Sequence, residues 1–143
     1  MSDLHVEAAP SGADIMRQFI PNSPYAQYLG IELVEISPDK AKLRLRRAPE
    51  LATMGTTIHG GAVASLIDTA AMAAAWSDRP PDTLRGATVS LSIAYLAAAA
   101  DGDLVADAVV LKRGGSLCYL DVLVHADPLG KAIAKGLATY KLG

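Results

Sequence analysis

Residues 59–70 read HGGAVASLIDTA and open the longest apolar stretch of the chain. The stretch continues to residue 77, is rich in Ala, and contains no Lys, Arg or Glu. This composition predicts a helix without a polar face, which must therefore be enclosed on nearly every side. In a chain of 143 residues only a curved sheet could enclose it, so we expect one long central helix wrapped by strands.

Alternating apolar residues on both sides of this helix predict the strands. Before the helix, strands are expected at residues 31–37 and 41–47, with Ala41, Leu43 and Leu45 facing inward. After it, the alternation predicts four more strands, at residues 89–95, 104–110, 120–124 and 133–140. Strands, one helix and then antiparallel strands form an α+β order, with a curved antiparallel sheet of about six strands.

Two short helices are expected before the first strand. Apolar residues share one helical face over residues 15–20, and Pro21 is expected to end that helix. In the second helix, Ser23 is placed to cap the start and Pro24 takes the first helical position. Gly30 suits the left-handed residue that ends it. A loop is expected over residues 48–58.

Length and charge predict one small domain that does not bind nucleic acid. Residues 1–12 show no periodicity and are expected to form a flexible arm, followed by a single domain over residues 13–143. The formal net charge is -2 and the basic residues are scattered, so no stripe of cations faces a phosphate backbone.

Cysteine and histidine usage limit the compartment and the chemistry. The single Cys118 excludes an intrachain disulfide framework, and the start lacks the apolar run of a signal peptide, which favours a cytoplasmic protein. Within the longest apolar stretch, the apolar run of residues 62–76 is interrupted by polar residues and falls short of the ~20 residues that cross a bilayer, so no membrane partner is expected. His5, His59 and His125 are widely separated, and we expect no metal site.

The stretch at residues 59–70 resembles the signature of hotdog-fold thioesterases related to the phenylacetate-pathway thioesterases. In that family a His-Gly-Gly opens the central helix, and an acidic residue nine positions after the His is catalytic. Here these residues are His59, Gly60, Gly61 and Asp68. The resemblance implies a hotdog fold, acyl-CoA thioesterase activity, and assembly as a homodimer or homotetramer.

The resemblance extends over most of the chain, with two departures in the loop before the helix. Residues 24–36 are similar to the family's entry helix and first strand, and residues 88–96 to the strand after the long helix. Family members commonly carry an Asn where Thr53 stands here, and a Gly one position after Gly55. Hydroxyl groups such as that of Thr53 would then supply the polar assistance.

Thioester hydrolysis needs a group that stabilises the developing oxyanion and a group that attacks or activates water. The amide of Gly60, at the positive end of the helix, is the expected oxyanion donor, although paired glycines can also merely fit a tight junction. Asp68 has no cation three or four positions away on the helix, so we interpret it as a general base or nucleophile. The alternative is a structural Asp held by hydroxyls such as Ser65, Thr69 or Thr88.

Helix geometry makes a prediction about assembly. Nine residues correspond to ~13 Å of rise and two and a half turns, so Asp68 projects from the face opposite that of His59. One helix cannot bring Gly60 and Asp68 to the same thioester. The working Asp68 is therefore expected from a neighbouring subunit, with two equivalent sites in each symmetric dimer.

Each accessory position of the expected site has two interpretations. His59 could orient the substrate or the loop, or could be a buried ring bonded to backbone carbonyls. Thr88 aligns with a family hydroxyl that holds water or the carboxylate, though Thr is also simply a good strand former. Contacts to coenzyme A are expected from Gly61, Lys112, Arg113 and Gly114, where the cations could meet phosphates or could belong to a solvated hairpin.

The predicted function is hydrolysis of an acyl-CoA to a carboxylic acid and free coenzyme A. No separate cofactor is expected, because coenzyme A is part of the substrate. The alternative is a hotdog domain that binds acyl-CoA as a sensor without hydrolysing it, since a fold alone does not establish catalysis.

Overall fold

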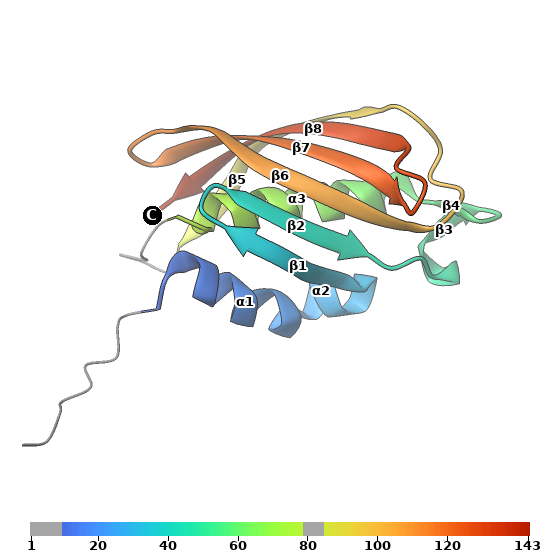
Figure 1. The fold of residues 1–143 in the computed structure, drawn as a ribbon, viewed down its shortest axis with the longest axis horizontal. Coiled ribbons are helices and arrows are strands. Elements are labelled where there is room, and N and C mark those ends of the chain that lie inside the picture. Colours follow the sequence, from blue (N-terminus) through green and yellow to red (C-terminus); the bar gives the residue numbers. More distant parts are fainter. Residues whose placement is uncertain (1–9, 79–84) are drawn as a thin grey trace, which may run out of the picture.

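The computed structural model describes residues 10–78 and 85–143 (Figure 1). Most of the expected N-terminal arm, residues 1–9, lies outside this description. Gly12, which the sequence assigned to the arm, instead begins the first helix. Ser11 caps that helix, because its Oγ accepts from the backbone N–H of Asp14 at 3.1 Å, and the Asp14 carboxylate accepts from the N–H of Ser11 at 3.2 Å.

The two N-terminal helices are α1 (Gly12–Asn22) and α2 (Pro24–Leu29). Pro21 does not end α1, as the sequence predicted, because in the last turn it removes only one helical hydrogen bond. Ser23 and Pro24 open α2 as expected, but the Ser23 side chain makes no capping hydrogen bond. Gly30 ends α2 in the left-handed conformation, with φ of 80°.

The predicted antiparallel sheet is confirmed, and four of its strands are longer than predicted. It has six strands in the order β1-β2-β6-β7-β8-β5. Strands β1 (Ile31–Ser37) and β2 (Lys40–Leu45) precede the long helix. The others are β5 (Gly86–Tyr95), β6 (Asp103–Arg113), β7 (Leu117–Asp127) and β8 (Ala132–Leu142). Ala41, Leu43 and Leu45 face the core as predicted, at 4%, 0% and 0% exposure.

The segment expected to be a loop before the long helix contains short elements instead. A 3-10 turn (Pro49–Leu51) leads into a small hairpin of β3 (Ala52–Met54) and β4 (Thr57–Ile58). Its two strands are too short to show a periodicity of two, which explains why the sequence pattern missed them.

The long helix α3 (Gly60–Trp76) packs inside the curve of the sheet and touches β1, β2, and β5 to β8 (Figure 1). Its contact with β8 is especially close. A Cβ added at Gly136 would lie 2.6 Å from Cγ2 of Ile67, so this strand position requires glycine.

Enclosure of α3 is nevertheless incomplete in a single chain. One stripe of the helix remains partly or fully exposed, at spacings of three and four residues that place its members on the same face. The stripe consists of Gly61, Ala64, Ser65, Asp68, Thr69 and Met72.

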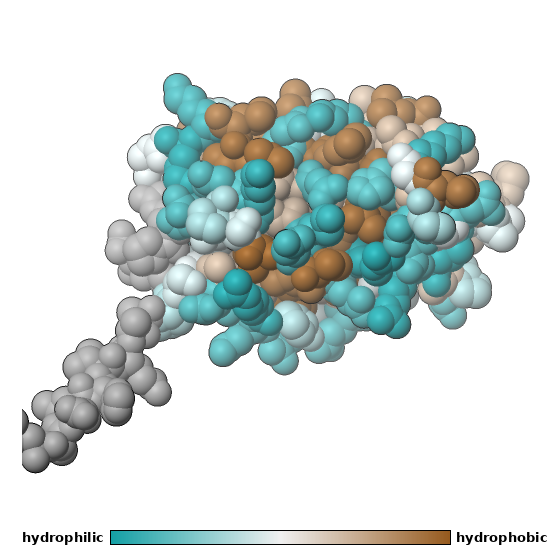
Figure 2. Space-filling view, viewed as in Figure 1, coloured by the Kyte–Doolittle hydropathy of each residue, from teal (hydrophilic) through white to brown (hydrophobic). Residues whose placement is uncertain are grey.

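The outer face of the sheet is mixed in polarity. Figure 2 shows hydrophobic patches among hydrophilic atoms on one side of the molecule. Ion pairs such as Lys135–Asp121, at 2.6 Å, lie beside exposed apolar side chains such as Leu137. None of the helices in the described part of the chain has both the length and the hydropathy needed to cross a membrane.

Gly136→Ala should lower the free energy of unfolding by about 1–3 kcal/mol, because the new methyl group overlaps Ile67. Ile67→Leu removes Cγ2 while keeping the side-chain volume. The variant with both substitutions should therefore lose less free energy of unfolding than the two single variants lose in sum. Urea unfolding at fixed protein concentration measures these differences.

Gly115→Ala is the matched control, because a Cβ at that position would meet nothing within 4 Å. Strictly additive costs for Gly136→Ala and Ile67→Leu would contradict the proposed overlap.

Candidate active site

The first turn of α3 is held by its own cap and leaves one amide unpaired. Nδ1 of His59 accepts from the N–H of Gly61 at 2.7 Å, and the His59 carbonyl accepts from Ala62 and Val63 at 2.9 and 3.3 Å. Of the first four amides of α3, only that of Gly60 has no hydrogen-bond acceptor within the described residues. The His59 ring is exposed and accepts from an amide, so it is not a buried ring bonded to carbonyls.

Gly60 lies in a cavity of about 430 Å³ at the start of α3. The lining is mostly apolar and comes from the β3–β4 hairpin, α3, the end of β5 and the segment that follows it. It consists of Thr53, Thr57, Ile58, Gly60, Val63, Tyr95, Leu96, Ala97, Ala98, Ala99 and Ile133. The structure thus brings Thr53, one of the expected site residues, to the same cavity as Gly60.

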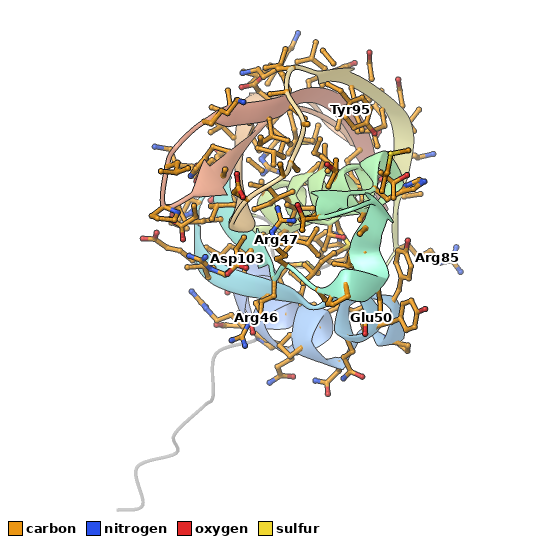
Figure 3. All side chains as sticks on the ribbon, turned by 90° about the vertical axis from the view of Figure 1, so that its right-hand side faces the viewer. Arg46, Arg47, Glu50, Arg85, Tyr95 and Asp103 are labelled. Carbon is orange, nitrogen blue, oxygen red and sulfur yellow. The ribbon has the colours of Figure 1, made fainter. Side chains whose placement is uncertain are left out.

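Arg47, which the sequence analysis did not select, ties the two walls of this cavity together. The half-buried guanidinium donates to the carbonyls of Gly102 at 2.8 Å and Ala99 at 2.9 Å, and also to that of Thr56. The Arg47 backbone N–H donates to the Asp103 carboxylate at 2.9 Å. Figure 3 looks onto this end of the molecule, where Arg47 and Asp103 lie close together. One signal for Arg47 is present in the sequence, a cation at an inward register position of the expected strand.

Asp68 lies in a different cavity, of about 230 Å³, between α1, α2, α3 and the start of β5. Its Oδ1 accepts from Oγ1 of Thr88 at 2.6 Å. Ser65 bonds instead to the Gly61 carbonyl and to Tyr25, each at 2.9 Å, and Thr69 donates to the Ser65 carbonyl. Thr88 is therefore the one of the three suggested hydroxyls that reaches the carboxylate.

Tyr140, which the sequence analysis also missed, forms part of the wall beside Asp68. The pKa of the Tyr140 phenol is raised above its ordinary value, mainly by burial. The nearby Asp68 carboxylate adds to this increase, and a hydrogen bond from Trp76 partly opposes it. The Trp76 indole donates to the phenol oxygen at 3.0 Å. The phenol therefore stays neutral at physiological pH, and Asp68 faces a neutral wall.

The cavities of Gly60 and Asp68 have no lining residue in common. The separation of eight positions between Gly60 and Asp68 corresponds to about 12 Å of helix rise. Within one chain, the structure therefore keeps the candidate oxyanion donor and the candidate carboxylate apart, as the helix geometry predicted.

The residues expected to bind coenzyme A phosphates lie at the other end of α3 from Gly60. Arg113 pairs with Asp39 at 2.8 Å and donates to the Ala75 carbonyl at 2.8 Å, so it holds the end of the helix. Gly114 donates to Leu117 at 2.7 Å within the β6–β7 hairpin, and Lys112 is exposed. In the described ranges, 10–78 and 85–143, no group of three or more His, Cys, Asp or Glu could hold a metal ion.

Comparisons with known proteins identify the family and the fold. The family model of the thioesterase superfamily matches residues 55–133. Human acyl-coenzyme A thioesterase 13 is 34% identical over 115 residues, which cover 79% of this chain and 80% of that protein. The crystal structure of a thioesterase family protein from Silicibacter pomeroyi has a TM-score of 0.84 at 25% identity, covering 93% of this chain and 100% of that chain.

The E. coli PaaI protein from the phenylacetic acid degradation operon has a TM-score of 0.75 at 22% identity, covering 86% of each chain. At this identity the likeness shows the fold alone, and it is the fold that the resemblance implied.

His59→Ala should lower the free energy of unfolding by about 1 kcal/mol, because the Gly61 amide loses its capping acceptor. His59→Asn should recover most of that loss, since the Asn side chain also accepts at this position. Thermal unfolding of the three proteins at one concentration measures the difference. Equal destabilisation by Ala and Asn would show that the ring does not act as a cap.

Proposed function

The chain belongs to the thioesterase superfamily, and we propose that it hydrolyses an acyl-CoA to a carboxylic acid and free coenzyme A. The observation that supports this proposal most directly is the unpaired Gly60 amide, which opens a long helix and lines a mostly apolar cavity. A donor at the positive end of a helix stabilises the negative charge that develops on a thioester oxygen under attack. Gly61, which is exposed, has no side chain because a Cβ there would lie 2.9 Å from Nδ1 of the capping His59.

The carboxylate of Asp68 would act as base or nucleophile. As a base it takes a proton from water, whose oxygen bonds to the carbonyl carbon. As a nucleophile it bonds to that carbon itself, and water then hydrolyses the resulting anhydride. In both routes the bond from carbon to sulfur breaks, and the sulfur leaves as the thiol of coenzyme A. Thr88 orients the carboxylate through its hydrogen bond.

The Asp68 that meets a given Gly60 would come from a second copy of the chain. Two unpartnered features support a dimer: the exposed stripe of α3, and β5, which in the described residues pairs on one edge only, with β8. An open strand edge is a natural site for pairing with another chain. Antiparallel pairing of two β5 strands about an axis between Leu91 and Ser92 would set Thr88 opposite the partner's Tyr95. Each Asp68 cavity would then face a Gly60 cavity.

We assign binding of the coenzyme to the end of the molecule where α3 ends. Lys112 is exposed on the β6–β7 hairpin there and could meet phosphates, whereas Arg113 holds the end of α3 and Gly114 bonds within the hairpin. A homotetramer would contain two of these dimers without changing the site. We also propose a cytoplasmic location, in keeping with the lone, buried Cys118.

The first test is a panel of acyl-CoAs, with release of free coenzyme A followed by a thiol-reactive dye. The wild-type protein should release coenzyme A, and Asp68→Asn should reduce the rate about 10²- to 10⁴-fold, because the base or nucleophile is lost. Glu35→Gln, on an exposed carboxylate of β1, should keep the wild-type rate. Tight binding of acyl-CoAs without release would support the sensor function and overturn hydrolysis.

The second test separates sites between two chains from sites within one chain. Gly60→Pro deletes the amide proton at the first helical position, which tolerates proline, and the extended His59 backbone suits a following proline. A differently tagged heterodimer of a Gly60→Pro chain and an Asp68→Asn chain should keep about half of the wild-type activity, since one composite site is intact. A site within one chain would leave no activity.

The reciprocal heterodimer pairs a wild-type chain with a chain that carries both substitutions. Here both composite sites are damaged, so the activity should be lost, whereas a site within one chain would keep half. Gly60→Ala is the matched control for the added side-chain atoms, because alanine retains the amide proton.

A further inference from the structure

We propose that Tyr95 is a positioning residue, which fixes the direction of the Gly60 amide toward the reacting carbonyl. This inference rests on the proposed function of Gly60 as oxyanion donor. The Tyr95 hydroxyl donates to the Gly60 carbonyl at 2.8 Å, across 35 positions of the sequence. Figure 3 shows Tyr95 inside the curve of the sheet, at the end of the molecule that carries the Gly60 cavity.

The contact holds one of the two peptide planes that meet at Gly60. The carbonyl of Gly60 and the N–H of Gly61 belong to the same planar unit. Tyr95 binds that unit at the carbonyl, and Nδ1 of His59 binds it at the N–H, at 2.7 Å. The unit therefore has a fixed partner at each end.

The other peptide plane carries the proposed oxyanion donor. It joins the His59 carbonyl to the Gly60 N–H, and that carbonyl accepts from the amides of Ala62 and Val63. The two planes can rotate relative to one another only through the backbone angles of Gly60. Because glycine is the residue with the widest choice of these angles, bonds on both planes are needed to keep the N–H in one direction.

The Tyr95 ring also favours glycine at position 60. A Cβ built there would lie 3.3 Å from Cε1 of Tyr95, which is tighter than most Cβ contacts, and 3.4 Å from Cζ. The ring thus rests against the Gly60 backbone. Its hydroxyl proton is engaged by the Gly60 carbonyl, so Tyr95 would act through the backbone and not as a donor to the substrate.

The position of Tyr95 links this contact to the proposed dimer. Tyr95 is the last residue of β5, the edge strand, and its side chain is 54% exposed in the single chain. Pairing of β5 with a second copy would immobilise the strand end that holds the Gly60 peptide. Dimer formation would therefore bring the Asp68 carboxylate of the second copy to the site and fix the direction of the Gly60 amide at the same time.

Tyr95→Phe tests the proposal, because it removes the hydroxyl and keeps the ring. The kcat for acyl-CoA hydrolysis should fall about 3- to 10-fold, the effect of one lost hydrogen bond, while KM stays within about twofold. Tyr28→Phe is the matched control, since that side chain is 82% exposed and should leave kcat unchanged.

Two acyl-CoA analogues separate positioning from a general change in the cavity. A ketone analogue, in which a methylene replaces the thioester sulfur, keeps the carbonyl that the Gly60 amide would bind, and a thioether analogue lacks that carbonyl. Tyr95→Phe should weaken binding of the ketone analogue about 3- to 10-fold and leave the affinity for the thioether analogue unchanged. The infrared carbonyl stretch of the bound ketone should move toward its value in a non-bonding solvent.

The outcomes distinguish this inference from the proposed function. If the wild-type protein releases no coenzyme A, the hydrolytic function fails, whatever Tyr95 does. If the wild-type protein is active and Tyr95→Phe matches it in kcat and in the ketone stretch, the positioning role is overturned. Equal weakening of both analogues would also overturn it, because that result would mean that Tyr95 only shapes the cavity.

Discussion

The close approach of α3 to the sheet is the constraint on which the rest of this structure depends. Gly136 admits Ile67 so near the backbone of β8 that a single added carbon would collide. Ala is the commonest residue of the helix for the same reason, since larger side chains would push the two layers apart. The sheet curves around the helix, and the helix ends are then fixed against the loops at either end of the sheet.

The two ends of α3 have different contacts because of this placement. The first turn meets the end of β5 and the hairpin of β3 and β4, where Arg47 holds the loops through their carbonyls. The last turn meets Arg113, which donates to the carbonyls of Ala74 and Ala75. Asp68 lies between these ends, on the stripe that the sheet does not reach. A rigid helix cannot fold back on itself, so within one chain the amide of Gly60 and the carboxylate of Asp68 stay in separate cavities.

The sequence predicted the helix and strands that depend on residue patterns, but not the contacts between residues that are distant along the chain. The long helix follows from its Ala-rich apolar composition and the six strands from apolar alternation, and both predictions are confirmed. Arg47 and Tyr95 were missed because each acts on backbone carbonyls that are distant in sequence, and no pattern of residue types records such contacts. The contact between Thr88 and Asp68 was among three suggested hydroxyl contacts, and only the fold selects it.

The departure at Thr53 has a physical interpretation in this arrangement. Thr53 lines the same cavity as Gly60, so a hydroxyl stands near the place where the family resemblance implies an amide side chain. The proposed oxyanion donor, however, is a backbone N–H, and its direction is set by His59 and Tyr95 rather than by residue 53. A change of side chain at 53 would therefore alter the secondary contacts to substrate or water and leave the principal donor in place. Backbone donors tolerate variation of neighbouring side chains in this way, provided that the peptide that carries them is held from both sides.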